Sequence, residues 1–167
     1  MLKKEQILKW IQELGNSIGK ENLSELFQDD KAQGDKKIGH GQFRELAALC
    51  GSAECYEEIE LLVKYNTAKA AYGQSWAKKC GSQQFGDMIV SYMEKIKESE
   101  QNAADVLPDL MHFFGFLYWQ SRVWSMENPE QKNNDKNSNW NRQDAPRDQK
   151  PNRGFGKQNP QHKGGYR

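Results

Sequence analysis

The feature that most constrains the fold of this chain is a change in composition after Met126. From Glu127 to Arg167 the sequence contains no Leu, Ile, Val, Met or Cys, and its three aromatic residues are widely spaced. A segment of this kind cannot bury enough apolar surface to offset the entropy that it loses on ordering. We therefore predict a folded domain over residues 1–126 and a disordered, Asn/Gln/Gly-rich basic tail over residues 127–167.

The distribution of charge follows the same division. The tail has nine Lys or Arg residues and five acidic residues, whereas the first 126 residues have fifteen and eighteen. A mildly acidic domain therefore carries a basic tail, although the net charge of the chain is only +1. The tail sequences RGFG and GGYR place Arg close to Gly and an aromatic ring, which is typical of flexible RNA-binding tails. A solubilising extension would have the same composition, so both interpretations stay open.

The first 126 residues have the apolar spacing of amphipathic helices. Apolar residues recur every three or four positions, and no stretch alternates between apolar and polar residues as a strand would. The sequence therefore predicts an all-α fold, a compact bundle of five to six helices. The expected helical segments are residues 7–18, 23–27, 43–50, 53–79, 85–96 and 103–125, with a polar loop over residues 28–41.

Three residues indicate local details of these helices. Ser52 is the expected N-cap of the helix over residues 53–79, because Ser side chains accept hydrogen bonds from the first helical turn. Gly73 is expected to bend the same helix. Pro108 is expected in the first turn of the last helix, where its missing N–H costs no hydrogen bond.

We expect no metal, cofactor or catalytic site. Cys50 and Cys55 have only His40 nearby and no second pair of ligands, whereas a structural zinc site needs four clustered ligands. Cys50 and Cys55 are better interpreted as small buried apolar residues, and the third cysteine is Cys80. The acidic residues form no convergent acid–base set, so an enzyme is not expected. The absence of a membrane-spanning run and of a secretory signal predicts a cytoplasmic protein with no membrane partner.

The segment IELLVKYNTAKAAYGQSWAKK, residues 59–79, is the candidate working surface. If it is one ideal helix, Lys64, Lys78 and Lys79 fall within roughly a 100° arc, and Lys69 lies about 140° from Lys64. Cations beside aromatic rings can follow a phosphate backbone and stack on bases. The alternative is that this segment is an ordinary helix of the bundle that binds no ligand. We expect the aromatic stripe to pack mostly inward and the lysines to point outward; this stripe contains Tyr65, Tyr72 and Trp76.

Three sequence motifs resemble the small helical subunit of type III CRISPR effector complexes, of the Csm type. They are GHGQFREL (39–46), IELLVKYNTAKAAY (59–72) and DLMHFFGFLYWQSR (109–122). In the first, Gln42 and Arg44 fit a Ser-Gln-x-Arg-like motif. The second has the two tyrosines seven residues apart, and the third fits an aromatic helix that ends in Tyr-x-Lys, through Tyr118 and Arg122.

The chain also departs from that family. Gly73-Gln74-Ser75-Trp76 stands where the family often has Arg, and Gly115 stands where it often has Glu. The insert near residues 28–37 and the long tail differ from compact members. These departures leave the individual contact residues open.

The resemblance implies a non-catalytic subunit that stacks in several copies along the crRNA backbone and supports the guide–target duplex through its phosphates. The implied partners are crRNA, target RNA, other effector-complex subunits and copies of itself. Combining the resemblance with the basic helix face, the predicted nucleic-acid-binding residues are Gln42, Arg44, Lys64, Lys69, Lys78, Lys79 and Arg122.

A second hypothesis is a stand-alone helical adaptor that binds proteins, with the tail as a flexible solubilising extension. Its motivation is an apolar belt around the last helix, since a helix that is apolar on most sides needs deep burial or a partner. The belt consists of Phe113, Phe114, Phe116, Leu117, Tyr118 and Trp119.

Overall fold

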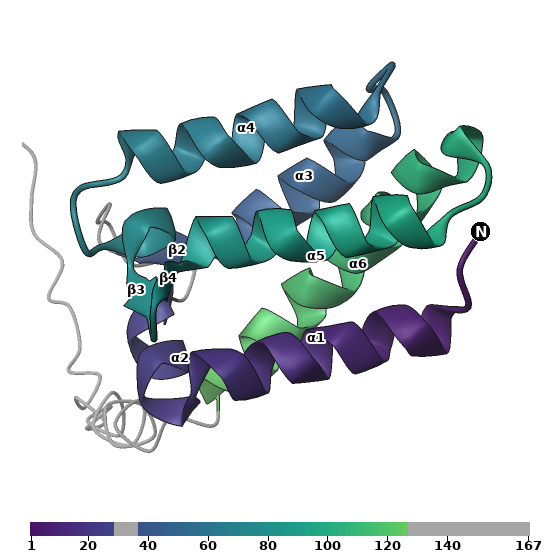
Figure 1. The fold of residues 1–167 in the computed structure, drawn as a ribbon. Helices are drawn as coiled ribbons and strands as arrows, with labels where there is room; N and C mark the ends of the chain where they lie inside the picture. Colours follow the sequence, from purple (N-terminus) through teal and green to yellow (C-terminus); the bar gives the residue numbers. More distant parts are fainter. Residues whose placement is uncertain (29–36, 127–167) are drawn as a thin grey trace, which may run out of the picture.

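The computed structural model describes residues 1–28 and 37–126, which form a bundle of six α-helices (Figure 1). The predicted all-α bundle is confirmed. The predicted disordered tail and most of the predicted polar loop lie outside the described residues. The helices are α1 (Lys4–Ile18), α2 (Lys20–Leu26), α3 (Gly41–Cys50), α4 (Tyr56–Lys69), α5 (Phe85–Ser99) and α6 (Ala103–Met126).

Four two-residue strands accompany the helices, although no strand was predicted. The first pair, β1 (Phe27–Gln28) and β2 (Ile38–Gly39), is parallel. The second pair, β3 (Lys79–Cys80) and β4 (Gln83–Gln84), is an antiparallel hairpin. Each pair is too short to show an alternating sequence pattern, because such a pattern needs four or more residues.

Helix α6 is the central element of the bundle. Figure 1 shows α4, α5 and α1 from top to bottom, with α3 and α6 behind them. The side chains of Phe113, Phe114 and Leu117 are fully buried, because α6 packs against α1, α3 and α5. Half of the predicted apolar belt is therefore core, and the partly buried Phe116 and Tyr118 pack against it. Trp119 differs, since 64% of its surface is exposed.

A cluster of aromatic rings joins five elements at one end of the bundle. The indole of Trp76 lies 5.5 Å from the ring of Phe85 and 5.8 Å from that of Phe43, centre to centre. Phe27 lies 5.7 Å from Trp124 by the same measure. These edge and stacked contacts are the arrangements that aromatic pairs prefer. The cluster therefore fixes β1, α3, the 3-10 turn η1 (Ser75–Ala77), α5 and α6 relative to one another.

The segment that follows α4 differs from its prediction. A single helix over residues 53–79 is wrong, because α4 ends at Lys69 and is followed by turns, η1 and β3. The C-cap residue of α4 is Ala70, and Gly73 lies in the turn beyond it with a left-handed backbone conformation, φ 72°, so it does not bend the helix. Beyond this turn the chain reverses so that Trp76, which is 3% exposed, enters the aromatic cluster.

Two predicted helix-end details are also wrong. Cys55, not Ser52, is the N-cap residue of α4, and the Ser52 hydroxyl donates instead to the carbonyl oxygen of Leu49. Pro108 lies inside α6, five residues after its first residue, Ala103. At that position the carbonyl of Ala104 has no N–H four residues later to bond with.

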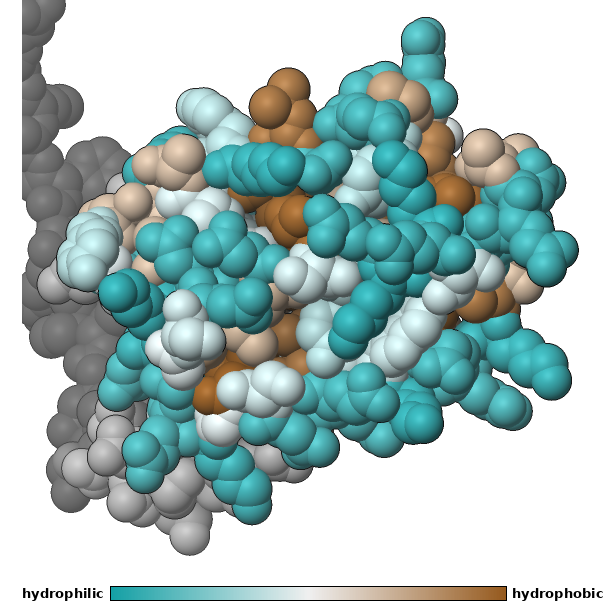
Figure 2. Space-filling model, in the orientation of Figure 1, coloured by the Kyte–Doolittle hydropathy of each residue, from teal (hydrophilic) through white to brown (hydrophobic). Residues whose placement is uncertain are grey.

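The face of the molecule drawn in Figure 2 is mainly hydrophilic, with small and scattered apolar patches. Among the described residues, no helix combines the length and apolarity needed to cross a bilayer.

Candidate nucleic-acid interface

Two exposed tyrosines each lie under a lysine ammonium group at the end of α4 and in the segment that follows it. The Nζ of Lys69 is 5.7 Å from the ring centre of Tyr65, and the Nζ of Lys79 is 5.9 Å from that of Tyr72. Tyr65 is 57% and Tyr72 is 83% exposed. The prediction that these tyrosines pack inward is therefore wrong, whereas the inward packing of Trp76 is confirmed.

These two Lys–Tyr pairs present a cation and an open aromatic face together. A lysine within about 6 Å of a ring is attracted by the electrons of the ring face. Neither Lys69 nor Lys79 forms an ion pair with any residue of the described ranges 1–28 and 37–126. Both positive charges are therefore available to an anionic ligand.

Two other predicted lysines are committed to carboxylates. Lys64 forms an ion pair with Glu60, one turn earlier on α4, and this hydrogen bond raises the pKa of Lys64. Lys78 forms an ion pair with Glu25 of α2, which lowers the pKa of that carboxyl. The predicted arc that contained Lys64, Lys78 and Lys79 does not exist, because the last two residues lie beyond the end of α4.

The remaining predicted residues lie on α3 and α6. Gln42 is half-buried, and its Oε1 accepts a hydrogen bond of 2.6 Å from the indole Nε1 of Trp76. Arg44, the next but one residue, is exposed on α3. On α6 the guanidinium of Arg122 lies 5.9 Å from the ring centre of Tyr118. Gln42 therefore supports the core, whereas Arg44 is an exposed cation and Arg122 a half-buried one, on separate helices.

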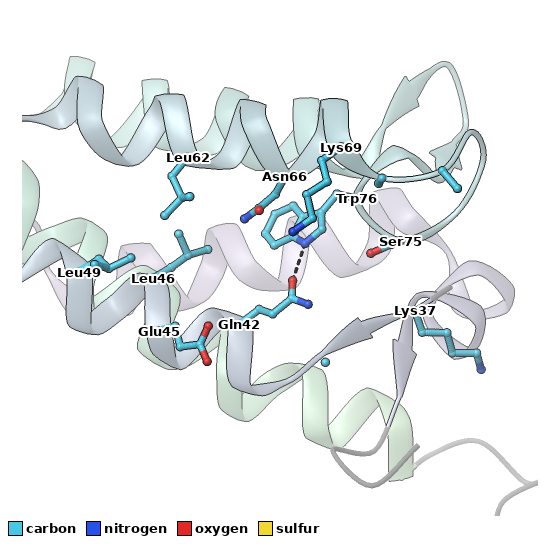
Figure 3. Close-up of a pocket in the computed structure, with 13 residues that line it drawn as sticks. Lys37, Gln42, Glu45, Leu46, Leu49, Leu62, Asn66, Lys69, Ser75 and Trp76 are labelled. Atoms are coloured by element: carbon cyan, nitrogen blue, oxygen red, sulfur yellow. Dashed lines mark hydrogen bonds between the residues drawn. The ribbon is translucent and has the colours of Figure 1, made fainter. Parts of the chain in front are cut away.

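A groove of about 720 Å³ opens between α3 and α4 (Figure 3). The sequence gives no direct sign of it, because consecutive helices joined by a short loop are expected to pack on each other. Figure 3 shows that α3 and α4 form its two sides and that Trp76 lies between them, next to Asn66 and Lys69. The groove is lined by Lys37, Gly39, Gln42, Glu45, Leu46, Leu49, Leu62, Asn66, Lys69, Ala70, Ala71, Ser75 and Trp76.

The groove exists because α4 packs on α5 rather than along α3. Gly86 of α5 permits this close approach, since a Cβ at residue 86 would lie 1.7 Å from Oγ1 of Thr67 on α4. The Thr67 hydroxyl turns back to donate to the carbonyl oxygen of Val63 at 2.9 Å. The glycine therefore brings α4 against α5 and leaves the other side of α4 open.

No cluster of metal-binding side chains accompanies the groove in the described part of the chain. Across residues 1–28 and 37–126, no three His, Cys, Asp or Glu side chains are placed to hold a metal ion. The prediction of burial is confirmed for Cys50 and is wrong for Cys55, which is exposed, and Cys80 is also buried. Comparisons with protein-family models, curated proteins and solved structures found no match to this chain.

Proposed function

We propose that this chain is a non-catalytic RNA-binding subunit of a type III CRISPR RNA-guided complex. Several copies stack along the crRNA backbone, next to other subunits, and support the duplex of guide and target RNA. Contacts to phosphates make the binding independent of RNA sequence. The motifs at residues 39–46, 59–72 and 109–122 support this family assignment.

The observation that carries the RNA-binding part is the presence of the two exposed Lys–Tyr pairs. A positively charged groove with aromatic rings on which bases stack is the usual platform for single-stranded nucleic acid. Tyr65 and Tyr72 offer ring faces, and Lys69 and Lys79 offer cations to the phosphates. The four residues come from a short stretch of chain, 65–79, so one RNA strand can contact several of them.

The test is fluorescence anisotropy with a labelled single-stranded RNA and with an RNA duplex. We expect Tyr65→Ala combined with Tyr72→Ala to weaken single-strand binding, since stacking contributes about 1–3 kcal/mol per base. Phe at both positions keeps the ring and should retain binding. As a matched control, Lys95→Gln changes a lysine 4.2 Å from the ring centre of Tyr92, which is buried.

Two outcomes would contradict the proposal. One is that the unmodified protein binds neither RNA at moderate salt. The other is that Lys95→Gln weakens binding as much as the double Tyr→Ala variant. The CRISPR assignment has its own test, because a gene with no CRISPR genes in its neighbourhood would not encode such a subunit.

A second candidate function is that of a protein-binding adaptor, which a different surface favours. An apolar stripe on α6 remains exposed, with Trp119 at 64%, Val123 at 45% and Met126 at 63%. Aromatic residues, Trp above all, often dominate the energy of protein interfaces. A stable complex with another protein that Trp119→Ser abolishes, in a chain that does not bind RNA, would support this function instead.

A further inference from the structure

We propose that the groove between α3 and α4 holds one unstacked nucleobase of a bound RNA, with the adjoining phosphate at Lys69. This inference deepens the proposed RNA-binding function and rests on it. It assigns a ligand to this groove, whose volume of about 720 Å³ falls in the usual range of ligand sites.

The groove has amide groups that can bond to the edge of a base. The Oε1 of Gln42 accepts from the Trp76 indole, so its Nε2 amino group remains as a donor at the groove. Asn66 points its carboxamide into the same space from α4 (Figure 3). Within the described ranges, neither Gln42 Nε2 nor the Asn66 amide has a hydrogen-bond partner. Amide side chains that pair with base edges are a common means of nucleic-acid recognition.

The remaining surface of the groove suits the faces of a heterocycle. Leu46 and Leu49 of α3 and Leu62 of α4 line it opposite one another (Figure 3). Leu49 is 42% exposed, so part of its apolar surface remains in water until a ligand covers it. A planar base between these side chains would bury apolar area on both of its faces, which is favourable.

The charges at the groove orient the ligand. Lys69 lines the groove and also lies over the ring of the exposed Tyr65, in one of the two Lys–Tyr pairs. The phosphate of an inserted nucleotide therefore belongs at Lys69. Glu45 lines the groove from α3 and would repel a phosphate. Its carboxylate can instead accept from an exocyclic amine, as Glu does with the amine of cytosine. The preference applies to the one inserted base, for which the site should favour adenine, cytosine or guanine over uracil. The phosphate contacts along the rest of the strand stay independent of sequence.

A strained residue fixes the position of Trp76 in the groove. Ser75 is buried and lines the groove, and its φ of 49° is the left-handed conformation that non-glycine residues rarely adopt. Such strain is concentrated at binding and active sites. Here it places the Trp76 indole against the Gln42 amide, so that the amide is oriented before a ligand arrives.

The experiment uses the full chain and a single-stranded oligoadenylate that carries one 2-aminopurine, whose fluorescence rises when the base leaves the stack. We expect a rise at saturation with the unmodified protein. Asn66→Leu removes the amide at similar volume, and Leu62→Trp fills the groove without changing its charge. Each should abolish the rise and weaken binding by about tenfold, the value of one good base contact.

Tyr72→Ala serves as the control, because it should weaken binding and still give the full rise at saturation. If RNA binds but the fluorescence does not rise, or if both groove variants behave as the unmodified protein, the groove does not hold a base. The latter result is also expected if a peptide occupies the groove. If the unmodified protein binds no RNA, the proposed function itself fails, and circular dichroism excludes unfolding as the cause in any variant.

Discussion

The indole Nε1 of Trp76 donates a 2.6 Å hydrogen bond to Oε1 of Gln42, which links η1 to α3 across 34 residues of sequence. The bond occupies the only polar atom of an indole that is otherwise surrounded by Phe43 and Phe85. It therefore anchors the chain after α4 to the core. The position of Lys79 and Tyr72 follows from this anchor, because both belong to the anchored segment.

Loss of this bond should destabilise the fold. Gln42→Ala leaves the buried indole N–H without a partner, which costs about 1–3 kcal/mol of unfolding free energy. Urea unfolding of Gln42→Ala, Trp76→Phe and the double variant measures the coupling directly. We expect the double variant to lose less unfolding free energy than the sum of the losses in the two single variants. Additive losses would show that the bond contributes nothing to stability.

The close contact between α4 and α5 should make the stability of the bundle sensitive to a side chain at residue 86. Gly86→Ala would place a Cβ 1.7 Å from Thr67 Oγ1 and 2.8 Å from its Cβ, so α4 must move away. Overpacking of this kind costs about 1–3 kcal/mol or more. Gly115→Ala on α6 meets no heavy atom within 4 Å and should gain about 0.5–1 kcal/mol. Thermal unfolding should show a lower melting temperature for Gly86→Ala and a higher one for Gly115→Ala. An unchanged melting temperature for Gly86→Ala would disprove the contact.

The core could be predicted from the sequence because helical periodicity reports burial. Ile7, Ile11 and Leu14 recur at three- and four-residue spacing, and all three are at most 1% exposed. The same spacing misled the interpretation of Tyr65 and Tyr72, which are seven residues apart but exposed. A one-chain pattern shows which residues can share a helix face, and it does not show whether a second element covers that face.

The site was less predictable because tertiary contacts create it. The end of α4 depends on the burial of Trp76 against Phe43, which is far away in sequence, and against Phe85 of α5. Gly73, in the turn beyond α4, is the nearest local signal, and from the sequence alone it predicts only a bend. The groove depends on Gly86, whose role appears only when α4 and α5 are in contact. Of the predicted site residues, Gln42 and Lys69 are the two that line the groove.

The three cysteines should differ in reactivity. Burial raises the pKa of the Cys50 thiol to about 12 and also raises that of Cys80, whereas Cys55 is exposed. Because the thiolate is the reactive form, iodoacetamide at pH 8 should modify Cys55 alone in the native protein. Mass spectrometry of the peptides locates the label. In Cys55→Ser the native protein should stay unlabelled until urea is added, and rapid labelling of Cys80 would contradict its buried position.

The buried carboxyl of Asp109 should make stability depend on pH. Burial raises its pKa, although its Oδ2 accepts a hydrogen bond of 2.7 Å from the Leu2 amide, and nearby Glu100 raises the pKa further. The folded state therefore holds this proton more tightly than the unfolded state. Its favourable contribution is complete below the unfolded pKa and decreases as the pH rises through the folded one. Asp109→Asn lacks this decrease. We therefore expect its free energy of unfolding to rise relative to that of the unmodified protein as the pH rises from about 4.

Glu57 provides a control of opposite sign for that measurement. A hydrogen bond of 2.8 Å from Lys97 lowers the pKa of Glu57, so its contribution is present above the unfolded pKa and is lost as pH falls. Urea unfolding across pH 4–7 measures this effect. The free energy of unfolding of Glu57→Gln should approach that of the unmodified protein as the pH falls. Parallel curves for Asp109→Asn and the unmodified protein would mean that Asp109 does not titrate differently on folding.

Ion pairing should divide the predicted lysines into two groups by their effect on RNA binding. Lys69 and Lys79 have no carboxylate partner in the described chain, whereas Lys64 and Lys78 are paired with Glu60 and with a residue of α2. A lysine that must leave a carboxylate to reach a phosphate gains less from that contact. Each phosphate contact adds about 0.7 to the slope of log affinity against log salt for single strands. Anisotropy titrations at several salt concentrations measure this slope.

We expect Lys69→Gln combined with Lys79→Gln to reduce that slope by about 1.4, the value for two phosphate contacts. Lys64→Gln combined with Lys78→Gln removes the same number of charges and serves as the matched control. It should change the slope less, because those charges are already partly neutralised. Equal reductions in both double variants would mean that net charge alone attracts RNA, and that the Lys–Tyr pairs have no special part in binding it.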